Sequence, residues 1–168
     1  NFQKIGAFKF RGASNAILSL SDQEARRGVV TMSSGNHAAA VALAARLRGI
    51  DAYIAMPETA PMAKRRAVEG YGGRITLKGT NINEVDESAH ALQEKTGAVM
   101  IHPFDDPRVI AGQGTVALEL LEDHPDLDAI IGPVSGGGLM SGTCITTSAL
   151  KPGIELYGAE PVNADDAH

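Results

Sequence analysis

The chain has 168 residues, of which 43% are apolar and 21% are charged, and its formal net charge is −5 at pH 7. This composition predicts a soluble, folded protein of one domain or two interleaved lobes, whereas the acidic balance and scattered basic residues argue against nucleic acid as a partner. The single cysteine, Cys144, excludes an intrachain disulfide and a cysteine-rich metal site.

No apolar run approaches the roughly 18 residues that a membrane-spanning helix requires, and the N-terminus lacks the form of a signal peptide. Together with the cysteine count, this predicts a reducing, cytoplasmic setting and no membrane partner. The chain starts with NFQK and ends with ADDAH directly after a strand-like segment. We therefore expect a piece of a longer protein that is truncated at both ends.

Short β-branched runs alternate with longer helical segments along the chain. Strands are predicted at 28–34, 50–57, 74–79, 99–104, 128–136 and 154–161. Helices are predicted at about 12–20, 36–49, 60–72, 82–97, 106–124 and 137–152, with end signals at Gly49, Gly70, Gly97 and Pro152. A further helical turn follows Ser21, with Glu24 completing a capping-box pattern. Repeated strand-then-helix order predicts parallel sheets and the α/β fold class.

The first unusual stretch is IGAFKFRGASNA, residues 5–16, which places Lys9 between Phe8 and Phe10. Partial loss of water lowers the pKa of a lysine and produces an amine that can act as a nucleophile or base near neutral pH. The alternative is a lysine whose stem lies over the rings with its charged head in solvent. Taken alone, the triplet favours that alternative.

The second unusual stretch, TMSSGNHAAA, lies where a predicted strand leads into an alanine-rich helix. In parallel α/β sheets, ligands bind outside the carboxyl ends of the strands. The hydroxyl groups of Ser33 and Ser34 and the free N–H groups at a helix start suit an anion or carboxylate. The alternatives are a plain helix cap by Ser34 or Asn36 and a structural, hydrogen-bonded role for His37.

The third stretch, IIGPVSGGGLMSG, places three consecutive glycines, residues 136–138, between an apolar strand and a helix. Main-chain N–H groups at such a turn favour a phosphate group, whereas a tight turn without a ligand would need only one glycine. A Walker loop is excluded because no lysine follows. A dinucleotide site remains open, since only Ser141 breaks the G-x-G-x-x-G/A pattern and Glu155 or Glu160 follows at a suitable spacing.

A small phosphorylated aldehyde, pyridoxal phosphate, accounts for the lysine, the polar turn and the glycine loop together. The motifs FKFRGA, SSGNHA and SGGGL occur in the order found in the fold-type II pyridoxal-phosphate enzymes, and the whole chain resembles the serine racemase and threonine/serine dehydratase branch of that family. The resemblance implies two α/β lobes, a small one at 18–107 and an incomplete large one formed by 1–17 with 108–168. It also implies that the Lys9 nitrogen faces the glycine bend.

The resemblance further implies roles for individual residues. Lys9 corresponds to the Schiff-base lysine, Phe8 lies beside the cofactor, and Asn36 corresponds to the asparagine that bonds the cofactor's ring oxygen. The residues of the substrate-carboxylate turn are Ser33, Ser34, Gly35, Asn36 and His37, and Ser34 is also the proton donor opposite the lysine in racemases. The phosphate loop comprises Ser135, Gly136, Gly137, Gly138 and Leu139.

A divalent-metal segment is implied in AEPVNADDA, with Glu160, the carbonyl of Ala164 and Asp166 as ligands for Mg²⁺, Ca²⁺ or Mn²⁺. The implied activity is an ammonia-lyase that dehydrates L-threonine, L-serine or a related β-hydroxy amino acid, with serine racemase as a second or main activity. A homo-oligomer, dimer or tetramer, is implied as well. The alternative class is a non-catalytic nucleotide-binding regulatory module, which would form no covalent adduct on Lys9.

Overall fold

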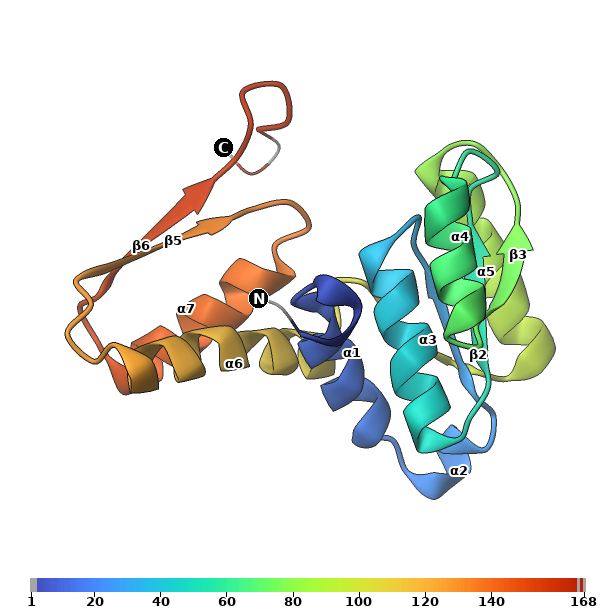
Figure 1. Cartoon of the computed structure of the whole chain (residues 1–168), viewed down its shortest axis with the longest axis horizontal. Helices are drawn as coiled ribbons and strands as arrows, with labels where there is room; N and C mark the ends of the chain where they lie inside the picture. The colour runs from blue at the N-terminus through green and yellow to red at the C-terminus, as the bar shows by residue number, and fades with distance from the viewer. Residues whose placement is uncertain (1–2, 166, 168) are drawn as a thin grey trace.

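The computed structural model describes residues 3–165 and 167 and shows an α/β fold in two parts joined by the first long helix (Figure 1). The helical elements are η1 (Lys4–Gly6), α1 (Lys9–Leu18), α2 (Asp22–Ala25), α3 (Asn36–Arg48), α4 (Met62–Gly70), α5 (Ile82–Thr96), α6 (Pro107–Asp123) and α7 (Gly138–Leu150). The strands are β1 (Val29–Met32), β2 (Ala52–Met56), β3 (Arg74–Leu77), β4 (Val99–Met100), β5 (Ala129–Pro133) and β6 (Glu155–Ala159). All six predicted strands and all predicted helical segments are therefore confirmed as elements.

The first part is a four-stranded, all-parallel sheet in the order β3-β2-β1-β4. Alternate residues of neighbouring strands face opposite layers. Val29 and Ile54 pack with α3, whereas Val30 and Ala55 pack with the α5 residue Val85. Because helices cover both faces, β1 is apolar and buried along nearly its whole length, as expected for a parallel sheet.

The second part contains the parallel pair β5-β6 and the helices α6 and α7. The two helices approach closely because they carry glycines where they meet. A methyl group on Gly142 would lie 2.5 Å from the carbonyl oxygen of Ile110, and one on Gly114 would lie 2.7 Å from the hydroxyl of Thr146. The sheet itself is only partly covered, with Ile131 73% exposed. None of the described helices combines the length and the hydropathy that a membrane span requires.

Several predicted boundaries are confirmed and several are wrong. Ser21 and Glu24 form the expected capping box, and Gly49 and Gly97 end α3 and α5 in the left-handed conformation. Gly70 is the last residue of α4 and so marks its end as predicted, but the left-handed conformation falls on Gly72, whose φ is 91°, directly after the C-cap Tyr71.

Pro152 directly follows Lys151, the C-cap of α7, as expected for a stop signal. Two other boundaries differ from the expectation. Helix α1 begins at Lys9, three residues before the predicted start. Strand β4 covers only Val99–Met100, because the carbonyl of Ile101 accepts bonds from side chains instead of from another strand. Helix α1 packs on both α3 and α6, so the division into lobes at residues 17 and 107 stays a prediction.

Candidate functional site

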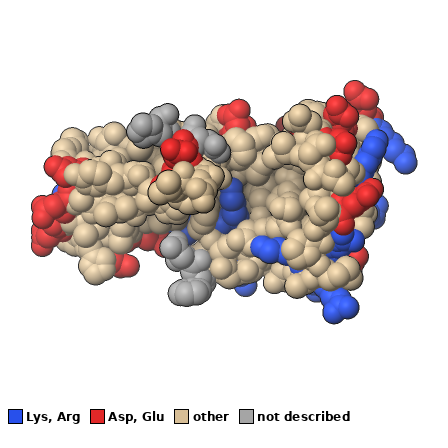
Figure 2. Space-filling view, turned by 90° about the horizontal axis from the view of Figure 1, so that it is seen from above, with Lys and Arg blue, Asp and Glu red and all other residues tan. Residues whose placement is uncertain are grey.

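A hollow lies between the two parts of the molecule, and basic side chains are visible on its walls (Figure 2). It contains two neighbouring cavities. One, of about 240 Å³, is lined by Phe8, Lys9, Phe104 and residues 133–139. The other, of about 490 Å³, includes Ser33, Ser34, Pro103, Phe104 and Ser135 among its lining residues. Because Phe104 and Ser135 line both cavities, the lysine, the serine turn and the glycine loop meet in one place.

Lys9 begins helix α1, and its side chain turns into the smaller cavity. Its Nζ donates a hydrogen bond of 2.6 Å to the carbonyl oxygen of Pro103 and lies 5.4 Å from the ring centroid of Phe8. Burial lowers the pKa of Lys9 below the ordinary lysine value. The alternative of a lysine head in open solvent is therefore wrong for this fold, although the carbonyl and the ring both favour the charged form.

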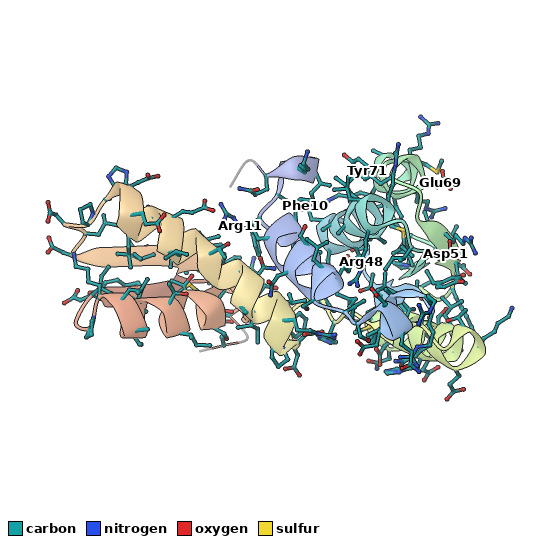
Figure 3. The ribbon with its side chains drawn as sticks, turned by 90° about the horizontal axis from the view of Figure 1, so that it is seen from below. Phe10, Arg11, Arg48, Asp51, Glu69 and Tyr71 are labelled. Carbon is teal, nitrogen blue, oxygen red and sulfur yellow. The ribbon has the colours of Figure 1, made fainter. Side chains whose placement is uncertain are left out.

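The residues that follow Lys9 fasten its helix on two sides, as Figure 3 shows. Phe10 packs against the core beside α3. Arg11 points toward α6, where its guanidinium donates to Thr115 and to both carboxylate oxygens of Glu119 at 2.5 to 2.9 Å. The two phenylalanines around Lys9 therefore differ in role, since Phe8 lines the cavity and Phe10 anchors the helix.

The glycine loop is shaped by Phe104. Gly137 is the N-cap of α7 and has a φ of 84°, a left-handed conformation that favours glycine. A methyl group on Gly136 would overlap the ring of Phe104, and one on Gly138 would lie 3.0 Å from its backbone. The expectation that one glycine would suffice for an empty turn is therefore wrong, because each of the three has a local steric reason.

What indicates an anion site here is the place of the α7 N-terminus beside Lys9, rather than the number of glycines. Helix α7 has no capping side chain, so its first N–H groups remain available beside the cavity that Lys9 lines. Asn81 and Asp106 cap α5 and α6 with their side chains, whereas α1, α3 and α4 share with α7 the lack of a capping side chain. A helix N-terminus and a partly buried amine facing one small cavity suit a ligand with a negative group and an electrophilic carbon.

The serine turn leads into α3 in a similar way. Gly35 is the N-cap and no side chain caps the helix, so the alternative of a cap by Ser34 or Asn36 is wrong. The Oγ of Ser33 instead accepts the N–H of Gly35 at 3.1 Å, while Ser34 is exposed. The short hydroxyl of Ser33 reaches the N–H before the helix starts, which leaves the first helical N–H groups without a capping side chain.

Asn36 and His37 line neither of the two cavities. The Oδ1 of Asn36 accepts a hydrogen bond of 3.1 Å from the Nζ of Lys64, a residue that the sequence analysis missed. His37 is only 2% exposed, and its Nε2 donates to the carbonyl of Ile101 at 3.0 Å. The structural, hydrogen-bonded interpretation of the His37 side chain is therefore confirmed, and only its main-chain N–H is left for a ligand.

Burial lowers the pKa of His37 to about 4, against a smaller opposing effect of the Ile101 carbonyl. The nearby Lys9 charge lowers this pKa as well. The imidazole is therefore neutral near pH 7 with its proton on Nε2. A neutral His37 adds no positive charge beside the amines of Lys9 and Lys64.

The expected metal segment gathers no visible cluster. No group of three or more His, Cys, Asp or Glu side chains suited to a metal ion occurs among the described residues. Glu160 accepts the N–H of Ala167 at 3.1 Å, which closes the segment on itself. Ala164 donates its own N–H to Pro161, and Asp166 lies outside the described residues.

Sequence reasoning also missed Pro103 and Phe104, which it assigned to a strand. The signal that could have found them is their position directly after β4, since ligand-binding residues collect at the carboxyl ends of parallel strands. The roles expected for the individual site residues remain predictions. What the structure does is bring Lys9, Phe8, Ser33, Ser34 and residues 135–139 to one hollow.

The family model of pyridoxal-phosphate dependent enzymes matches residues 1–168. The chain belongs to this family. Serine racemase of Oryza sativa subsp. indica is 55% identical over 166 residues, which cover 99% of this chain and 49% of that protein. L-threonine ammonia-lyase of Thermotoga maritima is 48% identical over 97% of this chain and 41% of that protein.

Solved structures agree with this assignment. The structure of maize serine racemase superimposes with a TM-score of 0.97 at 54% identity, covering 99% of this chain and 50% of that one. The chain thus spans about half the length of these relatives. The expected fold, that of the fold-type II pyridoxal-phosphate enzymes, is confirmed. Membership of this enzyme family argues against the alternative of a non-catalytic nucleotide-binding module.

Proposed function

We propose that the full-length protein is a pyridoxal-phosphate-dependent ammonia-lyase that dehydrates L-threonine or L-serine to a 2-oxo acid and ammonia, with serine racemisation as a second activity. The observation that carries this proposal is the Lys9 amine, held in the same 240 Å³ cavity as the uncapped glycine loop. Relatives of about 50% identity include both racemases and ammonia-lyases. Serine racemase as the main activity is the alternative.

The lining of the cavity fits the cofactor. Lys9 offers a partly buried amine, residues 135–139 offer main-chain N–H groups for a phosphate, and Phe8 offers an aromatic wall. The Nδ2 of Asn36 would donate to the ring oxygen, since the contact with Lys64 uses only Oδ1. When bound, pyridoxal phosphate supplies an aldehyde that joins to the amino group and a conjugated ring that withdraws electrons from the α-carbon.

The chain's own residues then handle the substrate's carboxylate and its protons. The uncapped N-terminus of α3, together with Ser33 and Ser34, receives the carboxylate. The Nζ of Lys9, with a pKa lowered by burial, takes the proton from the α-carbon. Loss of the β-hydroxyl then gives dehydration, whereas return of a proton from the Ser34 hydroxyl gives racemisation.

Three finer assignments belong to the same proposal. Glu160, the carbonyl of Ala164 and Asp166 would bind Mg²⁺, Ca²⁺ or Mn²⁺ through hard oxygen ligands. The protein would act as a cytoplasmic homo-oligomer on a small amino acid, with lobes at 18–107 and at 1–17 with 108–168. Terbium luminescence, with Glu160→Gln as the variant that lowers the signal, tests the metal segment in the full-length protein.

The activity itself is tested with the purified full-length protein, pyridoxal phosphate, and L-threonine or L-serine. Keto acid is measured with a coupled dehydrogenase and D-serine by chiral chromatography. We expect both products from the wild type and neither from Lys9→Ala, while the control Lys95→Ala, at an exposed position on α5, keeps the wild-type rate. Keto-acid formation by Lys9→Ala would remove Lys9 from the mechanism.

A further inference from the structure

Ile101 fixes the start of the turn that follows β4 to the four-stranded sheet. Its N–H donates to the carbonyl of Val30 at 2.9 Å. Its own carbonyl oxygen accepts two bonds, from the Oγ1 of Thr31 at 2.7 Å and from the Nε2 of His37 at 3.0 Å. All three residues are at most 2% exposed, and both lone pairs of the carbonyl are used. This point of the backbone is therefore held from two separate elements.

The next three residues, 102–104, connect Ile101 to the site. The imidazole of His102 accepts the N–H of Asp105 at 2.8 Å and stands edge-on to the ring of Phe104, with centroids 4.6 Å apart. The carbonyl of Pro103 accepts the Lys9 ammonium at 2.6 Å. The ring of Phe104 covers Gly136 and lines both cavities. Residues 101–104, named the bridge here, thus contact the lysine and the glycine loop at once.

The His37 side chain has a peculiarity that packing alone does not explain. It is buried and neutral, its Nδ1 has no hydrogen-bond partner among the described residues, and it lines neither cavity. An apolar side chain would fill the same space without burying an unpaired nitrogen. Within the described part of the chain, the His37 side chain makes one hydrogen bond, to the Ile101 carbonyl at the start of the bridge.

We infer that His37 and Thr31 are positioning residues that act through the Ile101 carbonyl: they fix the bridge, and the bridge sets where the Lys9 amine lies relative to the glycine loop. This inference rests on the proposed function in one respect: it takes pyridoxal phosphate as the ligand whose binding depends on the distance between the Lys9 amine and the glycine loop. It assigns no contact with substrate or cofactor to either side chain.

The test uses the full-length protein and measures two quantities, the Kd of pyridoxal phosphate by fluorescence titration and the Tm of the cofactor-free protein. His37→Leu removes the donor, and we expect the Kd to rise about tenfold. His37→Gln keeps an N–H at the end of the side chain and should stay within about threefold of the wild type. Val68→Ala, in the same core but on α4, is the control for general destabilisation.

Thr31→Val keeps the shape of the side chain and removes only the hydroxyl. If His37→Leu does not fold, Thr31→Val therefore tests whether loss of a bond to the Ile101 carbonyl raises the Kd. The inference is overturned if these donor-less variants lower the Tm as Val68→Ala does and bind the cofactor with the wild-type Kd. A wild-type protein that binds no pyridoxal phosphate would instead overturn the proposed function, so the two failures are distinguishable.

The far end of the bridge has a test of its own. Gly136→Ala should weaken cofactor binding because the new methyl group overlaps the Phe104 ring. Phe104→Ala opens that space, so the double variant Phe104→Ala/Gly136→Ala should bind more tightly than Gly136→Ala alone. Additive losses in the double variant would show that the ring does not set the position of the loop.

Discussion

The Nζ of Lys9 lies 2.6 Å from the carbonyl oxygen of Pro103, although the two residues are 94 positions apart in the chain. Two opposing effects act on this amine. Burial disfavours its charged form and lowers its pKa, while the carbonyl oxygen and the Phe8 ring stabilise the charge. The amine is therefore held beside the glycine loop with a pKa below the ordinary value. Such an amine suits the two roles proposed for Lys9, covalent attachment of the cofactor and removal of the substrate's α-proton.

The lowered pKa predicts an unusual titration of Lys9 in the cofactor-free protein. Acetylation at a series of pH values, followed by peptide mass mapping, gives the pH at which half of each lysine is reactive. For Lys9 this midpoint should lie below the ordinary value of 10.5. A midpoint at or above that value would mean that the Pro103 bond outweighs burial.

Gly137 should be required both for stability and for cofactor binding. Alanine at a φ of 84° costs about 1 kcal/mol or more, so Gly137→Ala should lower the Tm by a few degrees and also raise the Kd of pyridoxal phosphate. Gly153 provides a matched control, since its φ is 96° and nothing lies near enough to clash. Gly153→Ala should lose similar stability with an unchanged Kd. Equal Kd values for both variants would contradict a binding role for the loop.

His37 should make the fold sensitive to acid. Because its folded pKa, about 4, lies below the ordinary histidine value of 6.5, the unfolded chain binds the proton more readily between these values. Unfolding free energy therefore falls as the pH drops from 6.5 toward 4, by roughly 2 to 3 kcal/mol from this group. Urea titrations at pH 7 and pH 4.5 should show a larger loss in the wild type than in His37→Gln. An equal loss of unfolding free energy in the wild type and in His37→Gln would show that other groups cause the acid sensitivity.

Ser34 should control the choice between the two products. Its hydroxyl is exposed in the turn that lines the larger cavity, on α3's side of the hollow. Ser34→Ala should reduce D-serine formation at least tenfold more than keto-acid formation, because in the proposed mechanism only racemisation needs a proton from this group. Measuring both products in one reaction makes each the other's control. A parallel loss of both activities would assign Ser34 to substrate binding alone.

Local signals in the sequence predicted most of the fold. Left-handed glycines after α3 and α5 and the Ser21–Glu24 capping box were correctly located, because each depends only on neighbouring residues. The convergence of Lys9 with the glycine loop is implied by the family resemblance and is seen in the lining of one cavity.

Features set by distant contacts could not be derived in this way. Phe104 and Gly136 are in contact although no local sequence pattern indicates it. From the sequence, therefore, only a bound ligand accounts for three consecutive glycines. The bond from His37 to Ile101 is equally nonlocal, and it turns into the core a side chain that the motif placed at the substrate turn. The Lys64 contact with Asn36 was missed for the same reason.

Covalent mapping of the cofactor tests the central claim most directly. The full-length protein is incubated with pyridoxal phosphate, reduced with borohydride, digested, and analysed by mass spectrometry. We expect one modified residue, Lys9, and no modification at that position when the borohydride is added without the cofactor. A reduced adduct found only on other lysines, or none at all, would contradict the account of this site.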